Sequence, residues 1–218
     1  MSGARDAILG AVRAAASARR AGGDGTALPD DYIRPARARG DAAELLARFC
    51  DMAAFAGAGV TRVAGAAAVP PAISAFLSRE ALGDRLVLSP ERRIAELPWH
   101  DSPRLIVGRD APTADDRISV TGAVAAVAET GTLLVRSGPD IANALHLLAE
   151  IHIAIVPQGA IVGSYEDALG RLRALGELPR AATFITGPSR TADIEKTPQI
   201  GVHGPRRLQI VVIDGADA

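Results

Sequence analysis

Along this chain, short apolar runs alternate with segments in which apolar residues recur at helical spacing. The first pattern predicts strands and the second predicts helices. Short apolar runs are typical of buried strands, and they lie at residues 60–63, 85–88, 152–156, 182–185 and 208–213. Most segments between these runs carry apolar residues at helical spacing. We therefore expect an α/β protein whose largely parallel sheet is covered by helices.

Residues with capping or turn-forming side chains predict where several helices begin and end. Asp41 precedes a helical pattern that stops at the glycines of residues 57–59. The proline pair at 70–71 is tolerated in the first turn of a helix and predicts the next one. Ser164 and Asp167 have the spacing of a capping box and predict a third helix start.

The first part of the chain differs in pattern from the remainder. Residues 4–20 predict an amphipathic helix, whereas residues 22–40 are rich in glycine and proline and predict an irregular strap. We expect residues 1–40 to form an N-terminal helical extension with this strap. Residues 41–218 are expected to form the α/β domain.

The alanine-rich run at residues 118–128 allows two interpretations. It precedes a Thr-Gly turn and a second apolar run at 133–136, which is a pattern typical of a β-hairpin. A buried helix before the turn is the alternative. Residues 137–140 then predict the start of a helix that continues to Leu148.

Composition and charge exclude several functional classes. The 218 residues carry a net charge of −1, without the basic surplus that is typical of nucleic-acid-binding proteins. The single cysteine, Cys50, cannot form an internal disulfide or hold an iron–sulfur cluster within this chain alone. No apolar run reaches the ~18 residues of a membrane span and no signal peptide is visible, so we expect a cytoplasmic protein. We expect neither a cofactor nor a metal, since His100, His146, His152 and His203 lack metal-ligand spacing.

The first candidate for chemistry is the turn Glu129-Thr130-Gly131-Thr132, which directly follows an apolar run. A carboxylate that emerges from a buried element can have a raised pKa and can act as a nucleophile or a general base. A hairpin turn whose glutamate points to water accounts for the same residues. The sequence supports both interpretations equally.

The second candidate is the polar segment 186–205, which lies between the apolar runs at 182–185 and 208–213. A polar segment between two buried strands is where an α/β protein usually carries function. His203 belongs to the turn that closes this segment. A surface connection rich in turn-forming residues is the alternative.

Within this segment the residues suit an anion site. Ser189 or Thr191 can cap a helix whose free N–H groups bind an anion, and Arg190 can complete a carboxylate or phosphate site. A self-capped helix, in which Asp193 and Glu195 complement the helix dipole, is the alternative.

These residues resemble a known family. The LUD domain family, in its lactate-utilisation protein C branch, has motifs similar to Ala128-Glu129-Thr130-Gly131-Thr132, to the strand at 152–156, and to the segment 187–195 with Gly201-Val202-His203-Gly204-Pro205. The resemblance is densest over residues 117–214. It implies a fold like that of ribose-5-phosphate isomerase, glucosamine-6-phosphate deaminase and CoA transferases.

The same resemblance implies a part in oxidising L-lactate to pyruvate, together with an iron–sulfur subunit and a second partner. This chain would be the cluster-free component. A stand-alone enzyme acting on a phosphorylated sugar, a CoA thioester or a folate is the alternative, so it stays open whether the chain is itself an enzyme.

We expect the two motifs to meet at one end of the sheet around a small carboxylate or phosphate ligand. Glu129 is the candidate catalytic residue. The expected ligand-binding residues are Glu129, Thr130, Gly131, Thr132, Ser189, Arg190, Thr191, Asp193, Glu195 and His203.

Overall fold

The chain divides into two compact units, Met1–Ile33 and Arg34–Ala218. The computed structural model describes residues 2–21, 35–109, 113, 116–138, 141, 143–192 and 198–215. The first unit contains helix α1 (Ser2–Ala21), in agreement with the helix predicted at residues 4–20. Most of the predicted strap lies outside the described residues, and its end forms the short 3-10 helix η1 (Ala36–Ala38) of the second unit.

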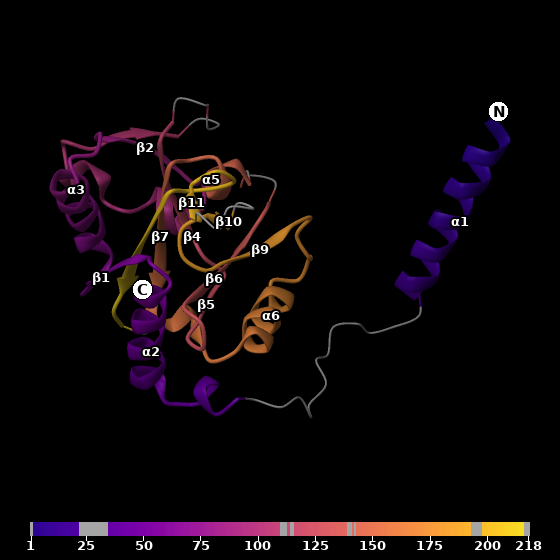
Figure 1. The fold of residues 1–218 in the computed structure, drawn as a ribbon, viewed down its shortest axis with the longest axis horizontal. Helices are drawn as coiled ribbons and strands as arrows, with labels where there is room; N and C mark the ends of the chain where they lie inside the picture. The colour runs from indigo at the N-terminus through magenta and orange to yellow at the C-terminus, as the bar shows by residue number, and fades with distance from the viewer. Residues whose placement is uncertain are drawn as a thin grey trace. The chain divides into compact units, whose positions relative to one another are not determined.

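The second unit is built on a six-stranded sheet in which every neighbouring pair of strands is parallel. This arrangement confirms the predicted α/β fold with a largely parallel sheet (Figure 1). In spatial order the strands are β1 (Gly59–Val63), β12 (Arg207–Ile213), β7 (Ile151–Pro157), β4 (Ile118–Gly122), β2 (Arg85–Leu88) and β3 (Ile106–Gly108).

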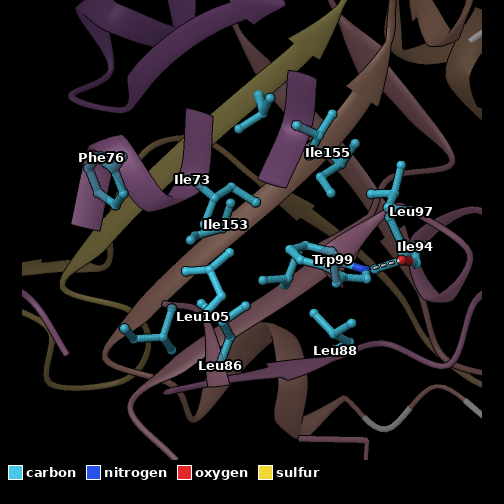
Figure 2. Close-up of a cluster of buried hydrophobic side chains, with 14 of the residues drawn as sticks. Ile73, Phe76, Leu86, Leu88, Ile94, Leu97, Trp99, Leu105, Ile153 and Ile155 are labelled. Atoms are coloured by element: carbon cyan, nitrogen blue, oxygen red, sulfur yellow. Dashed lines mark hydrogen bonds between the residues drawn. The ribbon is translucent and has the colours of Figure 1, made fainter. Parts of the chain in front are cut away.

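One face of this sheet packs on helices. The core there combines apolar residues of the strands with α3 (Val69–Arg79), α4 (Arg92–Ala95) and the 3-10 helix η3 (Trp99–Asp101). Figure 2 shows Ile153 and Ile155 of β7 in this cluster together with Ile73 of α3. The indole N–H of Trp99 donates to the carbonyl of Ile94 at 2.8 Å, so the only polar atom of that buried side chain is satisfied.

The other face is covered by helix α2 (Ala42–Phe55) and by a second sheet. This second sheet has the order β8 (Ile161–Val162), β5 (Ala125–Val127), β6 (Thr132–Arg136) and β9 (Ala182–Ile185). Helix α6 (Tyr165–Ala174) packs on its far side. In Figure 1, α3 and α6 accordingly lie on opposite sides of the unit.

The alanine-rich run divides between the two sheets. Its first part is β4 of the parallel sheet, and its second part, β5, forms an antiparallel hairpin with β6. The hairpin interpretation is confirmed and the buried-helix alternative is wrong. The predicted strand at 182–185 is also correct, but it pairs antiparallel with β6 and not within the parallel sheet.

Both predicted capping residues begin their helices. The Asp41 carboxylate accepts from the backbone N–H groups of Ala43 and Glu44, and Glu44 bonds back to Asp41. Ser164 and Asp167 form the same reciprocal arrangement at the start of α6. The helix expected from 137–140 to Leu148 is shorter, because only α5 (Ala144–Leu147) is helical among the described residues there.

The helix expected after Ser189 is not formed in the described part of that segment. Residues Arg190–Ala192 form β10, which pairs antiparallel with β11 (Pro198–Ile200). The backbone N–H of Ser189 donates to the carbonyl of Pro205 at 2.9 Å. Because these backbone groups are used in extended pairing, they cannot form the free N–H groups of a helix start, and that prediction is wrong.

Candidate functional site

A cavity of about 290 Å³ lies beside the amino-terminal ends of β7 and β12. It is bounded by α5, by β9 and the loop that follows it as far as Arg190, and by the turn 203–205. His152 and Leu208 are adjacent in the parallel register and contribute the sheet side of the wall. The second predicted motif therefore surrounds a cavity.

Two buried histidines belong to this cavity. His152 is fully buried and His146 is 2 % exposed, and their rings lie edge to face with centroids 5.6 Å apart. Thr121 Oγ1 lies 2.8 Å from His152 Nε2 in a hydrogen bond. Among the described residues, Nδ1 of His152 has no hydrogen-bond partner, and neither ring nitrogen of His146 makes a hydrogen bond of ordinary geometry, although the His146 ring lies near the backbone of Arg136. Buried polar atoms without a partner are costly, so a ligand that pairs with them would recover free energy.

Both histidines are held in the neutral form. Burial, together with a smaller electrostatic contribution from His146, lowers the pKa of His152 to about 3. Burial also lowers the pKa of His146. A neutral imidazole offers one N–H donor and one acceptor nitrogen, so the pair can bind a hydroxyl or carbonyl oxygen without adding charge to the site.

The loop after β9 is fixed by close packing on the end of α2. Gly187 has a φ of +70°, and a Cβ there would collide with the carbonyl oxygen of Ala56. Only glycine both adopts a positive φ without strain and leaves the space that a Cβ would fill. The Ser189 carbonyl accepts from Gly201 N–H at 3.0 Å, which ties this loop to the closing turn.

Arg190 supplies the positive charge of the cavity. One guanidinium nitrogen, Nη2, donates to the carbonyl of Ala56 at 3.2 Å, and the side chain is otherwise exposed. Within the described ranges no carboxylate pairs with it. An arginine oriented in this way can bind a carboxylate through its remaining N–H groups.

The first motif reaches this cavity through hydroxyl groups. Thr132 Oγ1 lies 2.7 Å from Thr186 Oγ1 and 2.7 Å from Thr130 Oγ1. The Tyr165 hydroxyl is 3.0 Å from both Thr130 and Thr132. Thr186 itself lines the cavity. The two motifs are therefore joined by a connected set of hydroxyls.

Glu129 lies apart from the cavity. Its carboxylate is 8 % exposed and accepts from Arg37 Nε at 2.8 Å. Gly131, with φ +67°, packs so closely on α2 that a Cβ would collide with the backbone of Ala53. The turn thus directs Glu129 toward the segment before α2, and the alternative interpretation, in which Glu129 points to water, is wrong.

The structure sorts the expected ligand-binding residues into groups. Ser189, Arg190 and His203 line the cavity, and Thr130 and Thr132 support it through hydrogen bonds. Three of the other positions lie elsewhere: Glu129 pairs with Arg37, Gly131 packs on α2, and Thr191 pairs with Gln199 in the β10–β11 ladder. Asp193 and Glu195 are outside the described residues.

The sequence pattern did not indicate His146 and His152 as candidate ligand-binding residues. A signal existed at His152, because a histidine within an otherwise apolar strand must be hydrogen-bonded or functional when buried. His146 carried no comparable signal. Its position became informative only when α5 was placed over the start of β7.

Two further observations concern metals and membranes. Among the residues that the structure describes, no three histidine, cysteine, aspartate or glutamate side chains lie close enough to hold a metal ion. None of the described helices combines the length and apolar character that crossing a bilayer requires.

The sheet order and the cavity define the class: an α/β protein with a small, histidine-lined cavity between its parallel sheet and a second sheet. Comparison with known proteins agrees with this class. The model of the LUD domain matches residues 107–213, which include every residue that lines the cavity.

Relatives and a solved structure identify the family. A lactate utilization protein C from Deinococcus radiodurans is 34% identical over 183 residues, covering 78% of this chain and 80% of that protein. One from Shouchella clausii is 36% identical over 117 residues, covering 52% of this chain and about half, 49%, of that protein. The crystal structure of a DUF162 family protein from Deinococcus radiodurans matches with a TM-score of 0.63 at 27% identity, covering 81% of this chain and 100% of that one. The chain belongs to the LUD domain family, in its lactate utilization protein C branch.

Proposed function

We propose that this chain is the cluster-free component of a lactate-utilisation system that oxidises L-lactate to pyruvate, and that the histidine-lined cavity binds the small carboxylate. The names of the relatives support the lactate-utilisation role. The observation that carries the ligand assignment is the combination, on one cavity, of two buried histidines and an arginine that has no carboxylate partner among the described residues.

This combination suits a 2-hydroxy or 2-oxo acid. Arg190 can pair with the carboxylate through two parallel N–H···O bonds. His146 and His152 can donate to, or accept from, the oxygen on the neighbouring carbon, and burial keeps them neutral near pH 7. The cavity of about 290 Å³ accommodates a three-carbon acid.

Oxidation of the acid releases electrons, and in this proposal a partner subunit accepts them. Conversion of L-lactate to pyruvate removes two electrons and two protons, one from the hydroxyl and one from the carbon that bears it. In this proposal the electrons pass to an iron–sulfur subunit, and this chain binds and orients the acid. The alternative, a stand-alone enzyme on a phosphorylated sugar, CoA thioester or folate, predicts turnover by the purified chain alone.

The ligand assignment is tested by calorimetric titration of the full chain with L-lactate and with pyruvate. We expect Arg190→Gln to weaken binding at least about tenfold, since a charge-assisted hydrogen bond contributes about 1.5–3 kcal/mol. His152→Gln should weaken it as well. His100→Gln, at an exposed position outside the cavity, is the matched control. If all three variants bound L-lactate and pyruvate equally well, the cavity would not be the binding site for the acid.

The cellular role is tested by growth on L-lactate as the carbon source. We expect deletion of the gene to prevent this growth, and Arg190→Ala to fail to restore it although the purified variant stays folded. Normal growth of the deletion strain would contradict the role in lactate utilisation. Turnover of a phosphorylated sugar, CoA thioester or folate by the chain alone, stopped by Glu129→Gln, would instead support the stand-alone enzyme.

A further inference from the structure

A second cavity, of about 560 Å³, lies at the opposite end of the parallel strands. Its wall includes Glu91, Arg92 and Arg93, which follow the carboxyl end of β2, and Val124, which follows β4. Arg136 at the end of β6 and Arg171 on α6 complete the polar part of the wall. It shares no lining residue with the histidine cavity.

The topology of the sheet marks this location. β2 and β4 are neighbours in the sheet. The next strand of this sheet after β2 is β3, which lies on the side of β2 away from β4, and the next one after β4 is β7, which lies on the side of β4 away from β2. Such a reversal opens a crevice outside the carboxyl ends of the two strands. In open parallel sheets, ligands bind at this crevice.

The lining is strongly basic. Four arginines and one glutamate give it a net charge of +3. Arg92 pairs with Glu96 at 2.8 Å and Arg93 pairs with Glu91 at 2.9 Å. Neither Arg136 nor Arg171 has a carboxylate partner in the part of the chain that the structure describes. Arg136 donates only to the carbonyl of Ser137, at 3.4 Å. Two guanidinium groups without carboxylate partners on the wall of one cavity favour the binding of an anion there.

The floor of the cavity is held by a partly buried hydrogen-bond network. Glu91 accepts from the backbone N–H of Gly122 at 3.0 Å and from Ser89 Oγ at 3.1 Å. Arg93 lies across the end of β4 so closely that a Cβ on Gly122 would collide with its guanidinium group. Glu91 therefore joins the ends of β2 and β4 and positions Arg93 at the same time.

The remaining wall is apolar. Val124 lies between the two sheets, and Ala174 and Leu175 are at the end of α6. We propose that this cavity is a second ligand site, which binds a phosphate-bearing small molecule with an apolar portion. Arg136 and Arg171 bind the phosphate, and the apolar wall contacts the rest of the molecule. Arginine matches phosphate geometry bidentately, and the size of the cavity suits more than a free phosphate ion.

The test uses the full chain and measures its thermal unfolding and its calorimetric binding of ADP, pyrophosphate and adenosine. ADP serves as a probe because it combines phosphates with an apolar ring. We expect ADP to bind below about 1 mM and to raise Tm by mass action, pyrophosphate to bind more weakly, and adenosine not to bind. The double variant Arg136→Gln/Arg171→Gln should weaken ADP binding at least about tenfold.

Arg104→Gln is the matched control, because it removes one exposed arginine outside the cavity. The double variant should keep the binding of L-lactate, which separates this proposal from that for the histidine cavity. Absence of ADP and pyrophosphate binding would overturn the proposal. Binding that is unaffected by the double variant, or equally weakened by the control, would overturn it as well.

Discussion

At the scale of single residues, burial decides what each polar side chain can do. His152 lies within an apolar strand and Glu129 follows one, yet His152 lines a cavity and keeps one ring nitrogen without a partner among the described residues, whereas Glu129 is paired with Arg37. The two outcomes follow from the neighbours that tertiary structure supplies. A free buried nitrogen indicates a ligand site, whereas a buried carboxylate with an arginine partner is already satisfied.

His152 gives a test of this difference through pH. Its pKa falls from an ordinary 6.5 to about 3 in the folded chain, so between these values only the unfolded chain binds the proton. Above pH 6.5, His152 therefore does not lower the free energy of unfolding. As the pH falls below 6.5, this free energy decreases, by about 2 kcal/mol at pH 5 for this one group.

His152→Gln should reduce this loss, as measured by urea denaturation at pH 7 and pH 5. His100→Gln, which exchanges the same residue types at an exposed position, controls for the substitution. If both variants lost as much stability at pH 5 as the unmodified chain, His152 would not be buried in its neutral form.

At the scale of elements, helix α2 organises the candidate site. Its last turn carries the carbonyl of Ala56, which accepts from Arg190. Gly187 packs against the same residue, and Gly131 packs one turn earlier on Ala53. Two glycines from two motifs therefore pack on the same end of α2.

Gly131→Ala tests that packing. The new Cβ would combine a positive φ with a collision against the α2 backbone, so we expect unfolding to become easier by more than about 2 kcal/mol. Denaturant unfolding measures the change. Gly170→Ala in α6 is the control, since it has open space around it and should be neutral or stabilising by about 1 kcal/mol. A mild effect at Gly131 would mean that the turn is free to shift.

At the scale of the whole molecule, the segment before α2 belongs to the folded unit. Arg37 pairs with Glu129, and the carbonyl of Ala38 lies against Gly163, where a Cβ would collide with it. The compact unit accordingly begins at Arg34. The predicted boundary between residues 40 and 41 remains a prediction that truncation can test.

Two truncated chains separate the possibilities. A chain of residues 34–218 should keep its Tm within about 2 °C of that of the full chain, because its cores are complete. A chain of residues 41–218 should lose several degrees, since Glu129 would keep a buried carboxylate without Arg37. Equal Tm values for the two truncated chains would place the boundary where the sequence predicts it.

Much of the local structure could be predicted because its causes lie close together in the chain. The caps at Asp41 and Ser164 depend on residues three positions away, and strand β7 follows from a run that is apolar except for His152. The helix expected after Ser189 failed for the opposite reason. Its serine and threonine suit a cap or an extended turn equally well, and pairing with β11 and Pro205 decided between them.

By itself the sequence determined the α/β class, most strand positions and the two motifs of the LUD domain family, since periodicity, capping and motif spacing are local properties. Only the tertiary structure decided what those motifs surround. It joined Thr132 to Thr186, turned Glu129 to Arg37 and placed His146 over His152. It also brought Arg136 and Arg171 to one cavity. These contacts depend on the strand order of two sheets, which the local pattern of residues does not specify.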